Sequence, residues 1–293
     1  MKMKGFSGHI FHSLFICFSM DWRLIVPEEK GWSQVDFSRA MDVRLRPGAP
    51  AMVTYPDGIW RGCHPLTPDE ITRAAQALSG FSLAAWKREL SQGFLPLPGG
   101  NRLGVCGVMG ENGVREITSL CVRLAHEAPG AGKDLFQQIK GQSALIAGPP
   151  GSGKTTLLRD LVRLYSESGV PVGVADERGE IAACQGGAPQ LNVGPMTDVV
   201  SFMEKGKALM LLIRAMAPRV AAADEIGSEE DARGILEAAL CGVTVLATAH
   251  GSGEKELFSR PGLSRLLRQK AFQQLVFLKK PGARPRIVPL EEG

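Results

Sequence analysis

Residues 148–155 read Gly-Pro-Pro-Gly-Ser-Gly-Lys-Thr, which satisfies the GxxxxGK[ST] pattern of a phosphate-binding loop, or P-loop. Such a loop has to join a buried strand to the start of a helix. The flanking sequence agrees, because residues 143–147 are mostly apolar and the apolar side chains between Leu157 and Tyr165 recur at helical spacing. The alternative is a glycine-rich turn that only joins a strand to a helix. We therefore predict strand, P-loop and helix in that order.

This motif predicts ATP and Mg²⁺ as the ligands of the chain. Glycines allow several backbone N–H groups and the helix N-terminus to point at phosphate oxygens. We expect Lys154 to contact the β- and γ-phosphates and the Thr155 hydroxyl to bind Mg²⁺. The predicted nucleotide-binding residues are Gly148, Gly151, Ser152, Gly153, Lys154, Thr155 and Thr156.

Strand and helix patterns alternate from about residue 141 to the end of the chain. The predicted strands cover residues 143–147, 172–175, 220–223 and 243–248. A helix with three acids in its first turn is predicted from Ser228 to Gly242. This alternation predicts an α/β fold: a P-loop NTPase domain over residues 141–293, with a RecA-like, mainly parallel, doubly wound sheet.

Acidic residues follow two of these strands, at the edge where the carboxyl ends of parallel strands gather. Asp224 is predicted to hold Mg²⁺, and Glu225 to orient or deprotonate the attacking water. Glu177, after the strand over 172–175, is a rival general base. The alternatives are that Asp224 and Glu225 are solvated acids at a strand end, and that Glu177 is a surface acid paired with Arg178.

His250 follows the strand over 243–248, where a polar group can sense the γ-phosphate, although a lone histidine is more often structural. The predicted catalytic set is therefore Glu225, Glu177 and His250. Arg178, Arg214 and Arg219 are candidates for an arginine finger that reaches the nucleotide of a neighbouring subunit. For each of these arginines an ordinary salt bridge is the alternative.

Residues 21–140 predict a smaller α+β domain. Residues 42–46 and 51–55 have strand patterns, and Thr67-Pro-Asp-Glu70 is a helix start for the apolar positions of 71–78. A second helix is expected over 82–92. Residues 1–20 are an uncertain extension. Two lysines precede a partly apolar run there, which loosely resembles a signal peptide, but a disordered extension or a start codon chosen upstream of Met20 fits better.

Length and composition exclude a disordered protein, a fibrous protein and a small scaffold stabilised by disulfides. The 293 residues are 44% apolar and 22% charged, which predicts about two globular domains. Six widely spaced cysteines show no zinc-binding pattern and predict reduced thiols in the cytoplasm. No run reaches the roughly 18 apolar residues of a membrane-spanning helix.

Charge is distributed unevenly along the chain. A net charge of +4 does not predict a polyanion binder. Residues 257–290, however, hold eight bases and no acid, and could meet an anionic membrane, an acidic partner or nucleic acid. Phe258, Phe272 and Phe277 are the aromatic residues of this segment that could stack on bases. The alternative is a solvated helix face followed by a basic loop.

Together these motifs make the chain resemble the stage III sporulation protein AA family, ATPases of endospore-forming bacteria that are similar to the motor ATPases of type II and type IV secretion systems. The resemblance covers nearly everything after Met20. In the second domain it rests on the P-loop with 157–160, on 174–181, on 210–219 leading to 224–227, and on 248–251. In the N-terminal domain it rests on 42–48 and 97–104.

The resemblance implies a homo-oligomeric ring, a hexamer, peripheral to the mother-cell face of the membrane around the forespore. There it would power or regulate membrane-embedded channel proteins. The resemblance implies an acidic box at Asp176-Glu177, a histidine box at His250, and a nucleotide site in which Lys154, Thr155 and Glu225 take the roles given above.

Two departures from the resembled proteins stand out. Gly227 lies where secretion motors tend to have an arginine, and Phe202-Met-Glu204 lies where a Gly-Cys-Pro turn is expected. The alternative function is a nucleic-acid-dependent P-loop ATPase that uses the basic C-terminal segment as its track, although nucleic acid is not the partner that we expect. A third possibility is an assembly factor that is gated by nucleotide and has negligible turnover. The sequence does not separate it from a motor, because both need the same P-loop.

Overall fold

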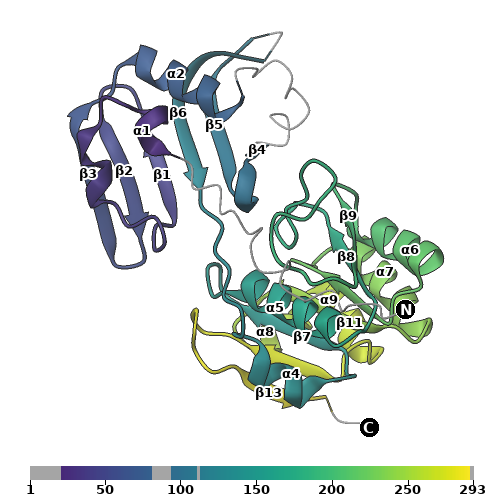
Figure 1. Cartoon of the computed structure of the whole chain (residues 1–293). Helices are drawn as coiled ribbons and strands as arrows, with labels where there is room; N and C mark the ends of the chain where they lie inside the picture. The colour runs from purple at the N-terminus through teal and green to yellow at the C-terminus, as the bar shows by residue number, and fades with distance from the viewer. Residues whose placement is uncertain (1–20, 81–93, 111–112, 291–293) are drawn as a thin grey trace, which may run out of the picture. The chain divides into compact units, whose positions relative to one another are not determined.

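The computed structural model describes residues 21–80, 94–110 and 113–290, and the chain forms two compact units that divide after Leu124 (Figure 1). This division lies before the boundary expected after residue 140. The reason is helix α4 (Lys133–Ile139), whose buried apolar side chains share a core with helix α5 (Lys154–Glu167) of the second unit. The extension 1–20 and the helix expected over 82–92 lie outside the described residues.

The first unit is α+β, as predicted, and contains a six-stranded antiparallel sheet in the order β3-β2-β1-β6-β5-β4. The strands are β1 (Asp42–Leu45), β2 (Pro50–Tyr55), β3 (Gly58–Pro65), β4 (Leu95–Pro96), β5 (Arg102–Gly110) and β6 (Gly113–Arg123). The helical segments are α1 (Trp22–Ile25), η1 (Lys30–Gln34), α2 (Pro68–Leu78) and η3 (Pro98–Gly100). Apolar side chains of α1, η1 and α2 share one core with the sheet.

Helix α2 begins where the sequence predicts, with a reciprocal capping box. The Thr67 hydroxyl accepts from the Glu70 N–H, and the Glu70 carboxylate accepts from the Thr67 N–H at 2.6 Å. His64 Nε2 lies 3.0 Å from the same carboxylate. Burial alone would raise the pKa of Glu70, but these hydrogen bonds outweigh it and lower the pKa to about 2. The ionised carboxylate therefore stabilises the start of α2.

The face of this sheet away from the core carries arginines. The register places Arg44 opposite Met52, Met52 opposite Arg61, and Arg123 opposite Arg102. Because side chains alternate between the faces of a strand, these arginines lie on the side opposite the buried residues of β1, β2, β5 and β6. We call Arg44, Arg61, Arg102 and Arg123 the arginine face.

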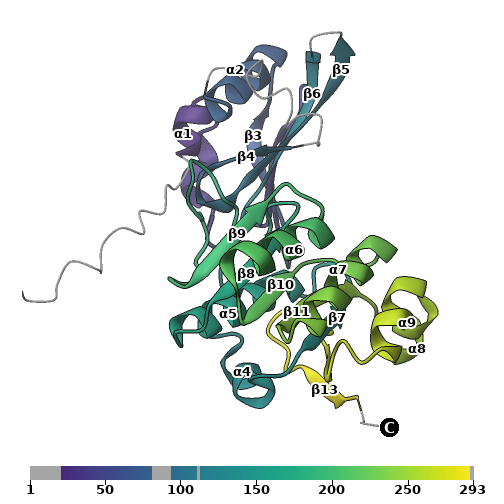
Figure 2. The ribbon, with the colours of Figure 1, turned by 90° about the vertical axis from the view of Figure 1, so that its right-hand side faces the viewer.

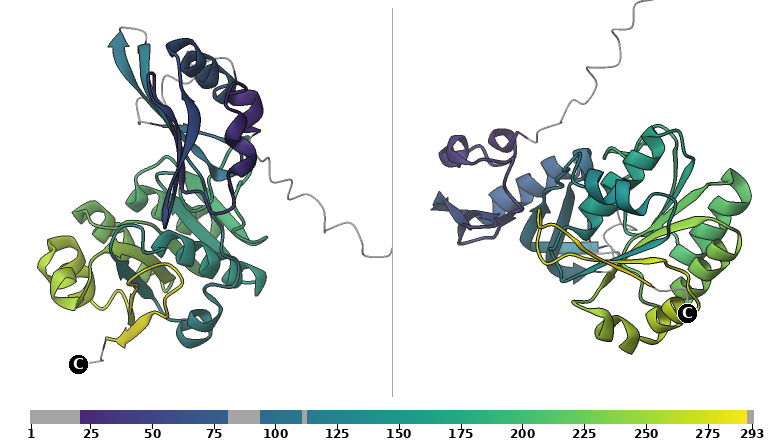
Figure 3. Two further views of the ribbon diagram at one scale, coloured as in Figure 1. Left: turned by 90° about the vertical axis from the view of Figure 1, so that its left-hand side faces the viewer. Right: turned by 90° about the horizontal axis from the view of Figure 1, so that it is seen from below.

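The second unit is an α/β domain with three layers, as predicted (Figures 2 and 3). Its sheet has the order β13-β12-β7-β11-β10-β8-β9, and all neighbours are parallel except β12 and β13. The strands are β7 (Ala144–Gly148), β8 (Val172–Asp176), β9 (Thr197–Ser201), β10 (Val220–Ala223), β11 (Thr244–His250), β12 (Gln274–Phe277) and β13 (Arg286–Pro289). Helices α4 and α5 cover one face. The other face is covered by α6 (Lys205–Met216), α7 (Glu229–Leu240), α8 (Glu254–Ser259) and α9 (Pro261–Arg268).

The four predicted strands and the helix from Ser228 are present as β7, β8, β10, β11 and α7. Strands β9, β12 and β13 are not among the predicted strands. The last two strands lie in the basic C-terminal segment, which is therefore part of the sheet rather than a helix face and a loop alone. Their four-residue lengths are too short for a clear period in the sequence.

Strand order brings the predicted motifs to one edge of the sheet. Strand β11 lies between β7, which leads into the P-loop, and β10, which leads into Asp224 and Glu225. The register pairs His250 with Gly148 and Ala247 with Ala223. The carboxyl end of β11 therefore lies between the P-loop and the two acids.

Candidate nucleotide site

The P-loop presents uncapped backbone donors at the start of α5. Gly151 and Gly153 have φ of +71° and +89°, which glycine adopts at little cost. Gly153 is the N-cap and supplies no side chain to the first N–H groups of α5, which lack intrahelical acceptors. The buried Ser152 Oγ has no hydrogen-bond partner among the described residues. These donors fit the phosphates that the motif predicts.

Lys154 lies at the first position of α5, with its side chain folded over the loop. Its Nζ donates to the carbonyl oxygens of Gly148 and Pro149, each at 3.0 Å, and lies 3.5 Å from His250 Nδ1. Burial lowers the pKa of Lys154, although Asp224 and Glu225 act in the opposite direction. The ammonium group therefore lies near Asp224 and Glu225, which follow β10, the second strand along the sheet from β7.

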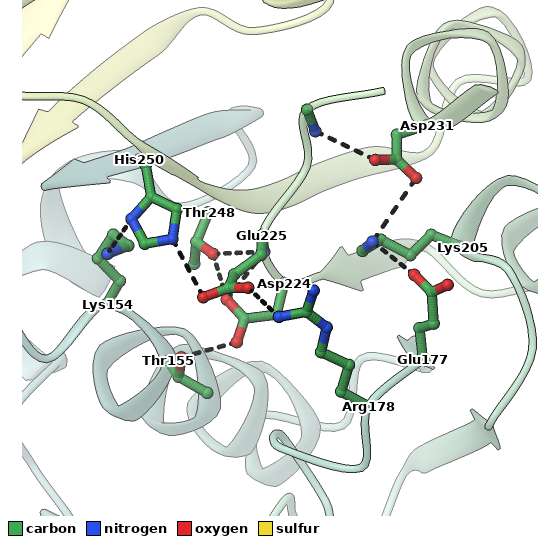
Figure 4. A network of polar contacts seen from close by, with 11 residues as sticks. Lys154, Thr155, Glu177, Arg178, Lys205, Asp224, Glu225, Asp231, Thr248 and His250 are labelled. Carbon is green, nitrogen blue, oxygen red and sulfur yellow. Dashed lines mark hydrogen bonds and ion pairs between the residues drawn. The ribbon is translucent and has the colours of Figure 1, made fainter. Parts of the chain in front are cut away.

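Asp224 is joined to both neighbouring motifs by hydroxyl groups (Figure 4). Thr155 Oγ1 donates to Asp224 Oδ2 at 2.7 Å, and Thr248 Oγ1 donates to Asp224 Oδ1. Asp224 is 8% exposed, and burial raises the pKa of its carboxyl, while these two hydrogen bonds lower it. The hydroxyl of Thr155 and the carboxylate of Asp224 are oxygen donors of the kind that Mg²⁺ prefers, so the pair fits the predicted metal.

Glu225 has an unusual backbone, with a φ of +49° in the left-handed region. Its N–H donates to Thr248 Oγ1 at 2.8 Å and to Asp224 Oδ1 at 3.1 Å. The carboxylate accepts from Arg178 Nη1 at 2.7 Å, and its other oxygen lies 3.2 Å from His250 Nε2. Glu225 therefore lies in a chain of polar contacts that leads through His250 to Lys154 (Figure 4).

Glu177 has different neighbours from Glu225. Its carboxylate accepts from Lys205 Nζ at 2.6 Å, and Lys205 also lies 3.7 Å from Asp231. Asp231 in turn accepts from the N–H groups that precede α7. The alternative pairing of Glu177 with Arg178 is not the one that the structure shows, because Arg178 contacts Glu225. Glu177 therefore belongs to a network that joins α6 to α7.

The loop after β8 is held by two buried ionic groups. The Asp176 carboxylate accepts from four backbone N–H groups of residues 180–183. On α5, the Arg159 guanidinium donates to the carbonyl oxygens of Glu180 and Ile181, each at 2.6 Å, and burial lowers its pKa. One small cleft is lined by charged residues from this loop and from the neighbouring elements: Asp176, Glu177, Arg178, Glu180, Lys205, Asp224 and Glu225.

Sequence reasoning misses several residues of this site: Thr248, Arg159, Glu180 and Lys205. Thr248 lies two residues before His250, at the end of the same strand, and its hydroxyl at that position is the available signal. Lys205 is supplied by α6, and no sequence spacing relates it to Glu177.

The other two arginine-finger candidates lie away from this edge. Arg219 directly precedes β10, and Arg214 is in the last turn of α6, so both are near the amino end of β10. Both are exposed. Of the three candidates, Arg178 is the one in contact with the catalytic set of its own chain.

Comparisons of sequence identify the family. The family described as "Sporulation stage III, protein AA" matches residues 18–290. Stage III sporulation protein AA of Bacillus subtilis (strain 168) is 36% identical in an alignment of 272 residues, which covers 87% of this chain and 85% of that protein. The chain belongs to this family. Membership in the stage III sporulation protein AA family connects it to spore formation, as the resemblance implies.

Solved structures with a similar fold include an ATPase and a pilus retraction motor. The ATPase DotB of Legionella pneumophila has a TM-score of 0.62 and 18% identity, over 86% of this chain and 78% of that one. The pilus retraction motor PilT, solved with bound ADP, has a TM-score of 0.57 and 17% identity, over 81% of this chain and 74% of that one. At these identities the likeness establishes the fold, an α/β P-loop fold.

The C-terminal basic segment is integrated into the second unit. Phe272 and Phe277 are 1% and 6% exposed, so both rings are buried in its core. Arg286 lies over the Phe277 ring, and Arg265 lies 3.7 Å from Glu229.

In the part of the chain that the structure describes, no helix is long and apolar enough to cross a bilayer.

Proposed function

We propose that this member of the family hydrolyses ATP during spore formation. The observation that carries the proposal is the contact between Thr155, at the start of α5, and Asp224, directly after β10. Beside this pair, Glu225 and His250 form a chain of contacts to Lys154. These are the parts that phosphoryl transfer to water needs, gathered at one edge of a parallel sheet.

Each residue has a role that its contacts support. The P-loop N–H groups and Lys154 bind the phosphates, and Lys154 exchanges its bonds to Gly148 and Pro149 for phosphate oxygens. Thr155 and Asp224 hold Mg²⁺, which offsets the negative charge of the phosphates when it is bound. Glu225 accepts the proton of the attacking water, and His250 orients the Glu225 carboxylate.

The finer role that we propose is a motor or regulator of a secretion-like channel, acting as a ring at the mother-cell side of the membrane. Support comes from the family's connection to sporulation and from the fold shared with the ATPase DotB and a pilus retraction motor. A ring would let a neighbouring subunit offset transition-state charge with an arginine. The candidate donors are Arg214, Arg219 and the arginine face, whereas Arg178 contacts Glu225 of its own chain.

One argument for the alternative, a nucleic-acid-dependent ATPase, is weakened. Two of the three phenylalanines that could have stacked on bases are buried in the core, namely Phe272 and Phe277. The sequence similarity is to a sporulation protein over nearly the whole chain.

The test is Mg²⁺-dependent ATP hydrolysis measured against protein concentration, with Lys154→Ala beside the wild type. The account predicts turnover that rises more than linearly with concentration and is lost in the variant, while the melting temperature of the second unit is retained. Arg233→Ala, an exposed position on α7, is the matched control and is expected to behave as wild type. Undiminished turnover in Lys154→Ala would contradict the proposal.

A further inference from the structure

Both carboxylate oxygens of Glu225 are engaged by donors. Oε2 accepts from Arg178 Nη1 at 2.7 Å, and Oε1 lies 3.2 Å from His250 Nε2. A general base needs an oxygen that is within reach of the proton it accepts. Each oxygen keeps a second lone pair, and release of either contact would open a further acceptor site on Glu225 for the proton of the attacking water.

His250 is the fixed partner of the two. It ends β11, where the register pairs it with Gly148 of β7. The Lys154 ammonium lies 3.5 Å from His250 Nδ1, which makes Nδ1 the acceptor and favours the tautomer with its proton on Nε2. His250 thus donates to Glu225 from a position that the sheet defines.

Arg178 is the more exposed of the two partners. Its side chain is 64% exposed and projects from the turn after β8. The other positively charged residue of the cleft is Lys205. Its side chain is 12% exposed and is held by Glu177 and Asp231. The N–H of Glu225 is bonded to Thr248 and Asp224, so departure of Arg178 frees the carboxylate without moving the backbone.

We propose that Arg178 is a positioning residue that acts in cis: it holds Glu225 in the absence of a γ-phosphate and leaves it for the γ-phosphate of bound ATP. The inference rests on the proposed function and adds the regulation of its general base. A terminal phosphate offers a guanidinium more charge and more acceptor oxygens than one carboxylate does. ADP has no γ-phosphate, so the ion pair persists when ADP is bound.

The test is a double-mutant cycle on nucleotide affinity, which needs no turnover. Binding of ADP and of a non-hydrolysable ATP analogue, both with Mg²⁺, is measured for wild type, Arg178→Ala, Glu225→Gln and the double variant. Arg178→Ala is expected to weaken binding of the ATP analogue and to leave ADP binding unchanged. Glu225→Gln is expected to tighten binding of the ATP analogue, because the amide no longer competes for Arg178.

Part of that tightening has another cause, since Glu225→Gln also removes a negative charge near the phosphates. This part is the same with and without Arg178, so the cycle separates it. We expect the tightening to be roughly two- to fivefold larger in the presence of Arg178 than in Arg178→Ala, the range of a half-exposed ion pair. Arg178→Lys should keep most of the preference for the ATP analogue over ADP, and Arg233→Ala all of it.

Two results would overturn the inference alone: equal effects of Glu225→Gln in both backgrounds, or equal loss of ADP and ATP-analogue affinity in Arg178→Ala. Recovery of turnover on mixing Arg178→Ala with Lys154→Ala subunits would also overturn it, because that result assigns Arg178 to the neighbouring site. Failure of the wild type to bind either nucleotide would instead remove the proposed function, and the inference with it.

Discussion

Replacement of Thr248 by valine removes one hydroxyl and keeps the branched shape of the side chain. Thr248 is fully buried, donates to Asp224 and accepts the Glu225 N–H at 2.8 Å. The Glu225 N–H keeps a second acceptor, Asp224 Oδ1 at 3.1 Å, so the main loss falls on the Asp224 carboxylate. A hydrogen bond to a buried charged group contributes about 1.5–3 kcal/mol.

We therefore expect Thr248→Val to lower the free energy of unfolding by about 2 kcal/mol, and the melting temperature by about 4–8 °C for a unit of this size. Turnover should fall roughly 10- to 100-fold, which corresponds to about 1.4–2.7 kcal/mol, because Asp224 and Glu225 both lose the group that positions them. Thermal unfolding followed by circular dichroism and a phosphate-release assay measure the two effects.

Thr248→Ser is the matched control, since it keeps the hydroxyl and removes only the methyl group. It should retain turnover within about threefold of wild type, since the hydrogen bonds persist. The reasoning is refuted if Thr248→Val keeps the wild-type turnover. It is equally refuted if serine and valine impair turnover alike, because packing of the methyl group would then be the cause.

Two further predictions concern the first unit and the assembly. The pKa of Glu70 is lowered to about 2, so its ionised form stabilises the folded state above the unfolded pKa of 4.5, and this stabilisation is lost as the pH falls toward 2. In urea unfolding, Glu70→Gln should cost about 1–2 kcal/mol at pH 7 and clearly less at pH 3, and an equal cost at both values would contradict the assignment. In the second experiment, Lys154→Ala subunits are mixed with subunits in which Arg214, Arg219 or one residue of the arginine face is replaced. Turnover should recover in the mixture whose second variant lacks the arginine that acts in trans. If no mixture recovers turnover, none of these arginines is the donor.

The elements around the site could be predicted because local patterns specify them. The P-loop spacing, the apolar strands on either side and the Ser228 capping box are all local signals, and β7, α5, β10 and α7 follow from them. Strand order is not local. The sequence contains Thr248 and Asp224, but their contact exists because β11 lies beside β10.

Adjacent acids show a second limit of sequence reasoning. Asp176 and Glu177 are neighbours after the same strand, yet Asp176 is 2% exposed and bonded to backbone N–H groups, whereas Glu177 contacts Lys205. The direction of each side chain depends on the path of the loop, which Arg159 holds from α5. The same holds for the C-terminal segment, where the number of bases gives no sign that Phe272 and Phe277 are buried.

The identity of the general base is the central claim, and one measurement tests it most directly: retention of MgATP by Glu225→Gln and Glu177→Gln, assayed together with single-turnover hydrolysis. The account predicts that Glu225→Gln binds MgATP at least as tightly as wild type and hydrolyses it at least 100-fold more slowly, since the amide cannot accept the proton of water, a loss of about 2.7 kcal/mol or more. Glu177→Gln should bind and hydrolyse ATP, because its carboxylate contacts Lys205 rather than His250. The opposite pattern, with Glu177→Gln trapped in the ATP-bound state and Glu225→Gln active, would contradict the account.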